Sequence, residues 1–216
     1  ESCIPFKNIK IINLGSSCIY PLNAENPISE DEFMNGKLEP TNSPYAMAKL
    51  TAIELGNAMK EQYGHKVINL MPTNLYGPND NFSEHDSHVI PGLMFRMEIA
   101  KNNNIDSFNI WGSGKPLREF LHVDDLSNAI KFIINNEIED SILNVGSGDE
   151  VSIKSIAENI KQVIQYKGVL SFDTSKPDGN PRKLLNSSKM LNYGWKPEIK
   201  LLDGLKSTYK WFQENI

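Results

Sequence analysis

Residues 10–17 read KIINLGSS, a short apolar run rich in isoleucine that ends at one glycine and two serines. Short runs of this kind are typical of strands buried inside a parallel sheet. A strand over Lys10–Leu14 would be followed by the loop Gly15-Ser16-Ser17. Loops at strand ends are where α/β proteins carry functional groups. The stretch therefore predicts a buried parallel strand that leads into a functional loop.

The segments that follow continue the alternation of strand and helix. Ser43-Pro44 combines an N-cap with a proline at the first helical position, and apolar residues then recur at helical spacing through about Met59. Lys66–Met71 is the next buried strand, which the prolines of residues 72–78 should break. Strand, helix and strand predict a βαβ unit with a right-handed crossover.

The rest of the chain alternates less regularly. The expected elements are a helix at 89–102, a strand at 108–111, a helix at 124–134, a strand at 142–145, a helix from the cap Ser152 to 166, a strand at 169–172 and a closing helix from 201. This order predicts an α/β fold. We expect a partial doubly wound, Rossmann-type parallel sheet in residues 1–78 and a smaller α/β lobe mainly in residues 79–216, with some segments returning to the first domain.

Composition narrows the function classes. The 216 residues carry a formal net charge of −5, so nucleic acid is a poor partner. No run of about eighteen apolar residues is present, which argues against a membrane protein. The only cysteines, Cys3 and Cys18, are too few for a disulfide framework and suit a reducing cytoplasm.

One part of a dinucleotide-binding sheet is missing from this sequence. Such a sheet opens with a glycine-rich turn inside a βαβ unit of about 30 residues. Gly112-Ser113-Gly114 does not open a helix and is no substitute. Because the first residue is also not methionine, we expect residues 1–78 to be the C-terminal part of a cofactor-binding domain whose N-terminal part lies upstream. The 216 residues alone should then be poorly folded or inactive.

Two residues on the first expected helix suit proton transfer. Tyr45 and Lys49 are four positions apart and share one helix face, where the ammonium can activate the phenol and hold a cofactor ribose. A chance pair on the surface explains that spacing equally well. Ser16 ends a strand about thirty positions earlier, which in a doubly wound fold brings its hydroxyl to the same sheet edge.

In order and spacing, Ser16, Tyr45 and Lys49 resemble the catalytic set of the extended short-chain dehydrogenase/reductases. Five segments resemble one branch of them, the GDP-L-fucose synthase family. They are Gly15–Pro21, Leu38–Asn42, Ser87–Pro91, Arg118–Asp125 and Lys176–Gly179. The resemblance extends from Leu14 to Trp211. It implies an oxidoreductase and isomerase that uses NADPH, epimerises GDP-4-keto-6-deoxy-D-mannose at carbons 3 and 5, reduces carbon 4 to give GDP-L-fucose, and forms a homodimer.

The resemblance also assigns the site residues. The catalytic residues it implies are Ser16, Cys18, Tyr45, Lys49 and His88. The cofactor-binding residues are Leu14, Gly15, Ser16, Ser17, Tyr45, Lys49, Pro72, Thr73, Asn74, Leu75 and His88. The substrate-binding residues are Arg96, Trp111, Arg118, Asp178 and Lys183, and no metal is implied.

Several of these residues have simpler explanations. Cys18 could be a small buried hydrophobe, and His85-Asp86-Ser87-His88 could suggest a metal site. Trp111 could belong to the core, the two arginines could form surface ion pairs, and Asp178 could only shape its turn. For the whole chain, the alternatives are another nucleotide-sugar epimerase or reductase of the same superfamily, and a truncated, non-catalytic fragment.

Overall fold

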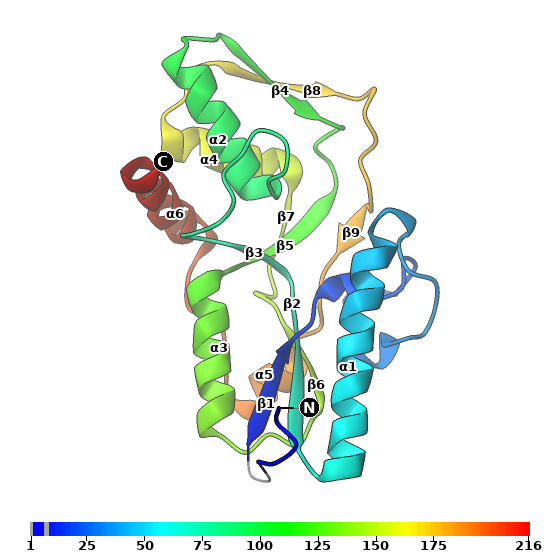
Figure 1. Cartoon of the computed structure of the whole chain (residues 1–216). Coiled ribbons are helices and arrows are strands. Elements are labelled where there is room, and N and C mark those ends of the chain that lie inside the picture. Colours follow the sequence, from blue (N-terminus) through cyan, green and yellow to red (C-terminus); the bar gives the residue numbers. More distant parts are fainter. Residues whose placement is uncertain (1, 7–8) are drawn as a thin grey trace. The chain divides into compact units, whose positions relative to one another are not determined.

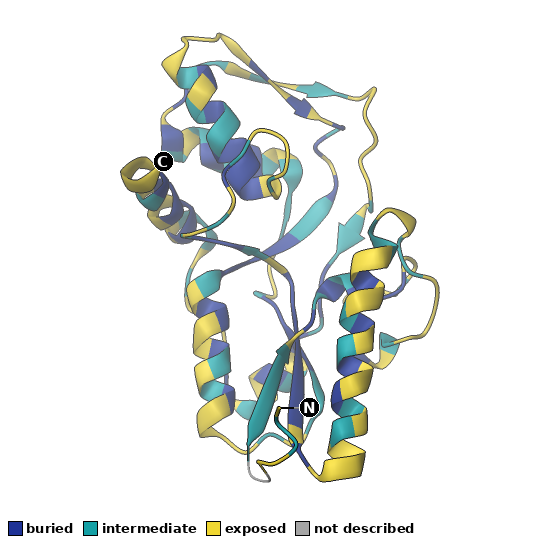
Figure 2. Cartoon of the chain, in the orientation of Figure 1, coloured by how far each residue is buried: buried dark blue, intermediate teal, exposed yellow. Residues whose placement is uncertain are grey.

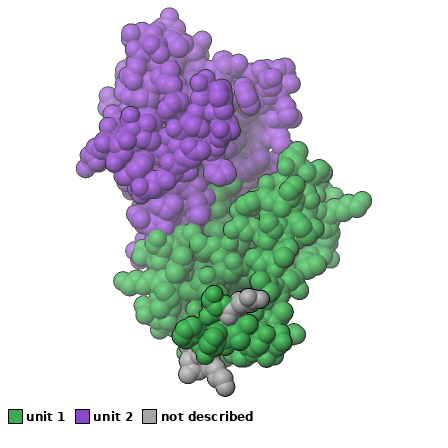
Figure 3. Space-filling model, in the orientation of Figure 1, with its two compact units in different colours: residues 1–74, 125–148, 184–197 green, residues 75–124, 149–183, 198–216 purple. Residues whose placement is uncertain are grey.

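The computed structural model describes residues 2–6 and 9–216, which fold into two compact units (Figure 1). Unit 1 contains the described residues up to Asn74 together with Asp125–Gly148 and Leu184–Pro197. Unit 2 contains Leu75–Asp124, Asp149–Lys183 and Glu198–Ile216. Figure 3 shows the two sets of residues in different colours. Each unit is therefore assembled from three separate segments of the chain.

A three-stranded parallel sheet in the order β1-β2-β6 forms the centre of unit 1. Its strands are β1 (Lys10–Leu14), β2 (Lys66–Pro72) and β6 (Ile142–Val145). Every residue of β2 after Lys66 is buried, as expected for the middle strand of a covered parallel sheet. The predicted α/β fold with a parallel sheet is confirmed, and the strand predicted over Lys10–Leu14 has those bounds in the structure. The prediction that this strand is buried is wrong, because β1 lies at the edge of the sheet and none of its residues is fully buried.

Helix α1 (Ser43–Tyr63) packs on β1 and β2, while α5 (Ser188–Tyr193) packs on β6. Figure 1 shows α1 on one side of the sheet and α3 (Val123–Asn135) on the other. Figure 2 shows α1 buried on its sheet side and exposed on its outer side. The close approach depends on Gly56, where a Cβ would lie 2.8 Å from Cγ1 of Val67.

The predicted start of α1 is wrong in one respect. Ser43 is the first helical residue rather than the N-cap, because the 3-10 helix Pro40–Asn42 runs directly into α1. That short helix is capped by Glu39, whose carboxylate accepts the N–H of Thr41 at 3.1 Å. The helix also runs beyond the predicted end to Tyr63, where Gly64 closes it with a φ of 72°.

Unit 2 contains two sheets and three packed helices. β4 (Ser107–Trp111) and β8 (Val169–Asp173) form a parallel pair. The second sheet contains β3 (Asn74–Tyr76), β5 (Leu117–His122), β7 (Glu150–Ser152) and β9 (Arg182–Lys183). Helices α2 (Val89–Asn102), α4 (Ile153–Ile164) and α6 (Leu201–Asn215) pack around a core rich in aromatic residues.

Most predicted elements of this part are confirmed, and their ends differ by a few residues. α2 has its predicted bounds, and Ser152 caps α4 by accepting the N–H of Ser155. Residues 72–78 end β2 at Pro72 as predicted, but they also contain β3, which joins β5 and was not predicted. Strands β5, β7 and β9 and helix α5 were not predicted. Every helix of the described residues is too short or too polar to span a lipid bilayer.

Asn144 of β6 is the centre of a buried hydrogen-bond network in unit 1. Its side-chain oxygen accepts the hydroxyl of Tyr20 at 2.6 Å, and its backbone N–H donates to the Glu30 carboxylate at 2.9 Å. Its side-chain nitrogen donates to the carbonyls of Ile28 and Asn186. Burial, followed by the nearby Glu30 charge, raises the pKa of Tyr20 well above its ordinary value of 10.0. Tyr20 therefore stays a neutral donor in the folded chain.

Replacing Tyr20 with phenylalanine should lower the free energy of unfolding by about 1–3 kcal/mol, because the Asn144 oxygen loses its buried donor. The same substitution should reduce the sensitivity of stability to alkali. The pKa of Tyr20 is raised in the folded state, so Tyr20 ionises more readily in the unfolded chain. Its contribution to the free energy of unfolding is therefore complete below about pH 10 and is lost at higher pH. Urea titrations at neutral and alkaline pH measure both effects. Equal alkaline losses in the two proteins would contradict this assignment.

Candidate functional site

The loop after β1 holds Ser16 and Cys18 in a short, well-fixed turn. Ser16 is the N-cap of the 3-10 helix Ser17–Ile19, and its hydroxyl oxygen accepts the N–H of Cys18 at 3.2 Å. Ile19 and Tyr20, which follow, are buried in the core of unit 1. Cys18 is only partly buried, so the simpler explanation that it is a fully buried hydrophobe is wrong.

Gly15 joins this turn to the sheet. Its N–H donates to the Leu70 carbonyl at 2.8 Å, which continues the β1–β2 ladder by one residue. A Cβ at this position would lie 2.5 Å from the sulfur of Met71, so a larger residue would push the turn away from β2. The glycine therefore lets the backbone after β1 lie directly against the neighbouring strand.

The first turns of α1 bring Tyr45 and Lys49 to the same end of the sheet. The Lys49 ammonium donates to the Leu14 carbonyl at 2.8 Å and lies 5.7 Å from the centre of the Tyr45 ring. Tyr45 itself is 47% exposed, which leaves its phenol accessible. Lys49 is thus tied to the last residue of β1, two positions before Ser16, and the explanation of an unrelated surface pair is not needed.

The predicted cofactor residues 72–75 follow the next strand of the same sheet. Pro72 ends β2, and the Thr73 N–H donates to the Val145 carbonyl at 3.1 Å. Since the carboxyl ends of parallel strands lie at one sheet edge, residues 14–17 and 72–74 share that edge. Leu75 belongs to unit 2 and lies in β3.

His88 lies in unit 2 as the N-cap of α2, and its side chain is exposed. Its imidazole does not cap the helix. Within residues 2–6 and 9–216, no group of three or more histidine, cysteine, aspartate or glutamate side chains is arranged to hold a metal ion.

Two arginines of unit 2 are half-buried without a neighbouring carboxylate within 4 Å among the described residues. The Arg96 Nε donates to the Gly92 carbonyl at 3.2 Å, and its guanidinium lies 5.4 Å from the Phe108 ring. Arg118 donates to the Leu117 carbonyl at 2.8 Å. Burial lowers the pKa of both guanidinium groups, and the charges of Glu84 near Arg96 and of Asp178 near Arg118 oppose that shift only in part. The explanation that they form surface ion pairs is wrong.

Lys183 adds to this positive charge, because it is paired with Arg118 in the register of β5 and β9. Side chains at paired positions project from the same face of a sheet, and like charges there are unfavourable unless an anion compensates them. Trp111 is 69% exposed at the end of β4, so it is not a core residue. Its exposed ring offers a flat surface for stacking.

Asp178 has a clear structural role. Its two carboxylate oxygens accept the backbone N–H and the hydroxyl of Ser113 at 2.6 and 2.7 Å, and these bonds lower the pKa of the carboxyl group. A Cβ on Gly112 would lie 2.5 Å from the same carboxylate. Asp178 therefore shapes the turn that follows Trp111 rather than its own turn, and both of its oxygens are already engaged.

Two residues that contact Asp178 and Trp111 were not predicted as site residues. Ser113 was noted only as part of a glycine turn, although it is the partner of Asp178. Lys176 places its ammonium 5.8 Å from the centre of the Trp111 ring. Both partners are more than 60 positions away in the sequence, so no local pattern could have revealed either contact.

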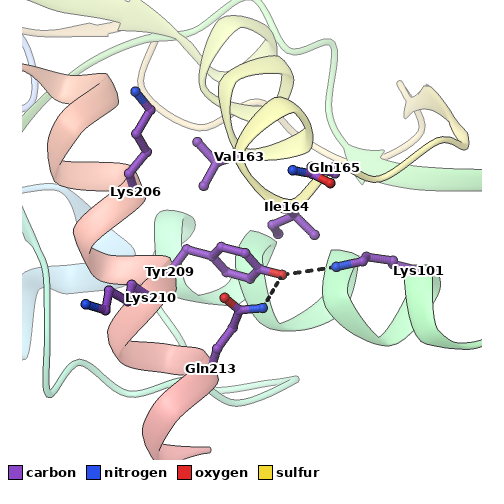
Figure 4. A pocket seen from close by; sticks show the side chains of 8 residues that line it. All are labelled: Lys101, Val163, Ile164, Gln165, Lys206, Tyr209, Lys210 and Gln213. Atoms are coloured by element: carbon purple, nitrogen blue, oxygen red, sulfur yellow. Dashed lines mark hydrogen bonds between the residues drawn. The ribbon is translucent and has the colours of Figure 1, made fainter.

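A separate surface hollow of about 330 Å³ lies among α2, α4 and α6 of unit 2 (Figure 4). Tyr209 is at its centre, accepting from Lys101 at 3.2 Å and from Gln213 at 3.1 Å while donating to Glu98 at 2.7 Å. Burial and the Glu98 bond raise the pKa of Tyr209. These polar groups satisfy one another, and Lys101 lies in the last turn of α2, where a cation compensates the helix dipole. The hollow contains no predicted site residue.

Comparison with known proteins identifies the relatives of this chain. Residues 2–146 match the NAD dependent epimerase/dehydratase family. A protein of Arabidopsis thaliana named Putative GDP-L-fucose synthase 2 is 53% identical over 207 residues, which are 96% of this chain and 63% of that protein. The GDP-L-fucose synthase of Escherichia coli (strain K12) is 47% identical over 215 residues, 95% of this chain and 67% of that protein.

A solved structure shows the same likeness. The chain superimposes on a GDP-L-fucose synthetase from Naegleria fowleri bound to NADP with a TM-score of 0.91 and 34% identity, over 99% of this chain and 68% of that one. The predicted resemblance is confirmed, although the chain spans only 63% of the length of the Arabidopsis relative. With its parallel sheet and the match over residues 2–146, the chain belongs to the NAD dependent epimerase/dehydratase family.

Proposed function

We propose that this chain carries the chemistry of a GDP-L-fucose synthase, which epimerises GDP-4-keto-6-deoxy-D-mannose at carbons 3 and 5 and reduces carbon 4 with NADPH. The turn of Ser16 and Cys18 carries the proposal. It fixes a partly exposed cysteine two residues after Ser16, with the Cys18 N–H bonded to the Ser16 hydroxyl, at the sheet edge where Lys49 donates to Leu14. A plain 4-epimerase or 4-reductase has no need of an additional acid or base at this position, whereas a 3,5-epimerase does.

Unit 2 would bind the nucleotide part of the substrate. Arg96, Arg118 and Lys183 supply positive charge for the diphosphate, and guanidinium groups can contact it with two parallel hydrogen bonds. Trp111 would stack on the nucleotide through its exposed ring. Asp178 would act indirectly, since its carboxylate holds the turn after Trp111.

Unit 1 would stabilise charge on the sugar. The carbon 4 ketone acidifies the hydrogens on carbons 3 and 5, and each proton removal leaves an enolate. Ser16 and Tyr45 would donate hydrogen bonds to its oxygen, a role for which one positioned donor typically contributes about 10²- to 10³-fold in rate. Cys18 would remove the carbon-bound protons and His88 would return protons to carbon, with the thiol as base and the imidazole as acid.

The residues at the sheet edge fit the nicotinamide half of NADPH. Gly15 keeps the backbone of the β1 turn against β2, and Lys49 places an ammonium at the end of β1 where a ribose hydroxyl could accept from it. When bound, the cofactor supplies hydride to carbon 4. Tyr45 would give the oxygen its proton. The described residues contain no glycine-rich turn between a strand and a helix that could hold the cofactor phosphates.

The proposal is tested by supplying the chain with GDP-4-keto-6-deoxy-D-mannose and NADPH, following NADPH absorbance and identifying the sugar product by NMR. Epimerised keto sugar without NADPH consumption supports the proposal and the expectation that cofactor phosphates need a further segment. GDP-L-fucose formation supports the whole reaction. Reduction without epimerisation would identify a different nucleotide-sugar reductase, and no change in the sugar would favour a non-catalytic chain.

We also propose that the chain forms a homodimer in a reducing, cytoplasmic setting, where the Cys18 thiol stays reduced. The support is the outer face of α1, on which Met47 and Leu55 are 55% and 62% exposed and Thr51 and Ala58 are exposed between and beyond them. A second copy could cover this face through its own α1. Homo-oligomers of two subunits pair identical surfaces in this way.

Replacing Leu55 with glutamate should convert such a dimer to a monomer, because the symmetry of the interface brings two added charges together. Sedimentation velocity measures the mass. Leu191→Glu is the matched control, since Leu191 is a similarly exposed leucine on another helix of unit 1. A dimer that survives Leu55→Glu, or a wild-type monomer, would contradict the proposed interface.

A further inference from the structure

The loop before α2 is held together by the hydroxyl of Ser87. The Ser87 oxygen accepts the Ser83 N–H at 2.6 Å. Its hydrogen can be donated to the carbonyl of Asn81 at 2.6 Å or of Ser83 at 2.7 Å. Two weaker bonds close the loop, from Asn81 to the Asp86 carbonyl and from the Asp86 N–H to the Ser83 hydroxyl, both at 3.1 Å. More of the bonds in this loop involve the Ser87 hydroxyl than any other side chain.

Core packing holds one end of the same loop, and a helical hydrogen bond holds the other. Phe82 is buried in the core of unit 2, where its ring lies 5.8 Å from that of Trp211 and 5.0 Å from that of Phe212. At the other end, the Gly92 N–H donates to the His88 carbonyl at 2.9 Å and closes the first turn of α2. His88 therefore lies between a loop with little freedom and a helix.

Gly92 also lies close to the side chain of Ser87. A Cβ added to Gly92 would lie 3.2 Å from the Cβ of Ser87, which is closer than side chains normally pack. The backbone of Gly92 is helical, so its conformation does not demand glycine. A glycine inside a helix destabilises it relative to alanine, and a close approach is a physical reason for it to occur there.

We propose that Ser87 is a positioning residue for His88, and that glycine occurs at position 92 because it lets Ser87 lie against α2. The inference rests on the proposed function for the role of His88 in proton transfer. The hydroxyl fixes the backbone that carries the imidazole, while the imidazole itself stays exposed and does not cap the helix. The substrate then meets a proton donor whose backbone is already ordered, and the side-chain torsions are its remaining freedom.

The first readout needs no activity. Nitrogen-15 relaxation should give the His88 backbone amide an order parameter of about 0.85 in the wild-type chain and below about 0.6 in Ser87→Ala. Hydrogen exchange at the Ser83 amide should quicken in the same variant, because that amide loses its acceptor. Ser107→Ala is the control, since Ser107 is exposed at the start of β4 and should alter neither signal.

The second readout is incorporation of solvent deuterium into GDP-4-keto-6-deoxy-D-mannose. Ser87→Ala should lower kcat for this exchange by about 10- to 100-fold with little change in KM, since a misplacement of about 1 Å can cost 100-fold. Ser87→Thr keeps the hydroxyl and should restore most of the rate. Gly92→Ala should lower the rate as well, because its methyl group would lie 3.2 Å from the Ser87 Cβ and push Ser87 away from α2.

The outcomes separate this inference from the proposed function. If the wild-type chain exchanges no deuterium, the proposed function fails, and the order parameter at His88 alone decides whether Ser87 holds it. An unchanged order parameter in Ser87→Ala would overturn the positioning role. A fall in the exchange rate of Ser87→Ala that only matches its loss of folded protein would also overturn it. A wild-type exchange rate in Gly92→Ala would do the same.

Discussion

Cys18→Ala should abolish the exchange of the carbon 3 and carbon 5 hydrogens of GDP-4-keto-6-deoxy-D-mannose with solvent. A positioned general base typically contributes about 10²- to 10⁴-fold, and alanine cannot accept a proton. Folding should be little affected, because Cys18 is only partly buried while the buried Ile19 and Tyr20 anchor the turn. Proton NMR in deuterium oxide measures this exchange, because the proton signals of carbons 3 and 5 disappear with the wild-type chain and should persist with Cys18→Ala.

Cys3 provides the matched control, since it is the one other cysteine of the chain and is likewise partly buried. Cys3→Ala should exchange both hydrogens at the wild-type rate. Exchange at the wild-type rate in Cys18→Ala would remove the thiol from the mechanism. An equal loss in both variants would indicate a general effect of thiol removal on the fold.

Arg118→Leu should weaken binding of GDP by about 10- to 100-fold. The Arg118 guanidinium is half-buried, and Lys183 is paired with Arg118 in the β5–β9 register, so the two side chains project from the same face of the sheet. A charged hydrogen bond to a diphosphate is worth about 1.5–3 kcal/mol, which corresponds to that range of dissociation constants. Titration calorimetry with GDP measures the change without any need for cofactor or turnover.

Arg182→Leu is the control for total charge. Arg182 precedes Lys183 in the same strand but is neutralised by Glu150, whose carboxylate lies 2.8 Å from its Nε. Its loss should change GDP affinity by less than about threefold. If both variants weaken binding equally, the diphosphate responds to the overall positive charge of the unit, and Arg118 has no specific role.

Strands made of mostly apolar runs could be predicted from the sequence. Lys10–Leu14 and Ile142–Val145 are short and mostly apolar, with only Lys10, Asn13 and Asn144 polar, and both have their predicted bounds. β5 was missed because its sequence, LREFLH, mixes charged and apolar residues. Two of its polar residues, Glu119 and His122, are nonetheless buried. Their burial depends on partners from distant segments, which a local pattern cannot supply.

The candidate site shows the same division. Tyr45 and Lys49 could be paired from their spacing, because a helix places them on one face. The bond from Lys49 to Leu14 joins residues 35 positions apart, and the bonds from Ser113 to Asp178 join residues 65 positions apart. Which later segments return to the first unit could not be predicted for the same reason, since each unit gathers three distant segments.

The most direct test of the proposed function is deuterium incorporation from solvent into GDP-4-keto-6-deoxy-D-mannose by the 216-residue chain without NADPH. Every residue assigned to proton transfer lies within this chain, and the exchange step needs no hydride. Our proposal predicts deuterium at both carbon 3 and carbon 5, lost in Cys18→Ala and retained in Cys3→Ala. A folded chain that leaves both positions unlabelled would contradict it.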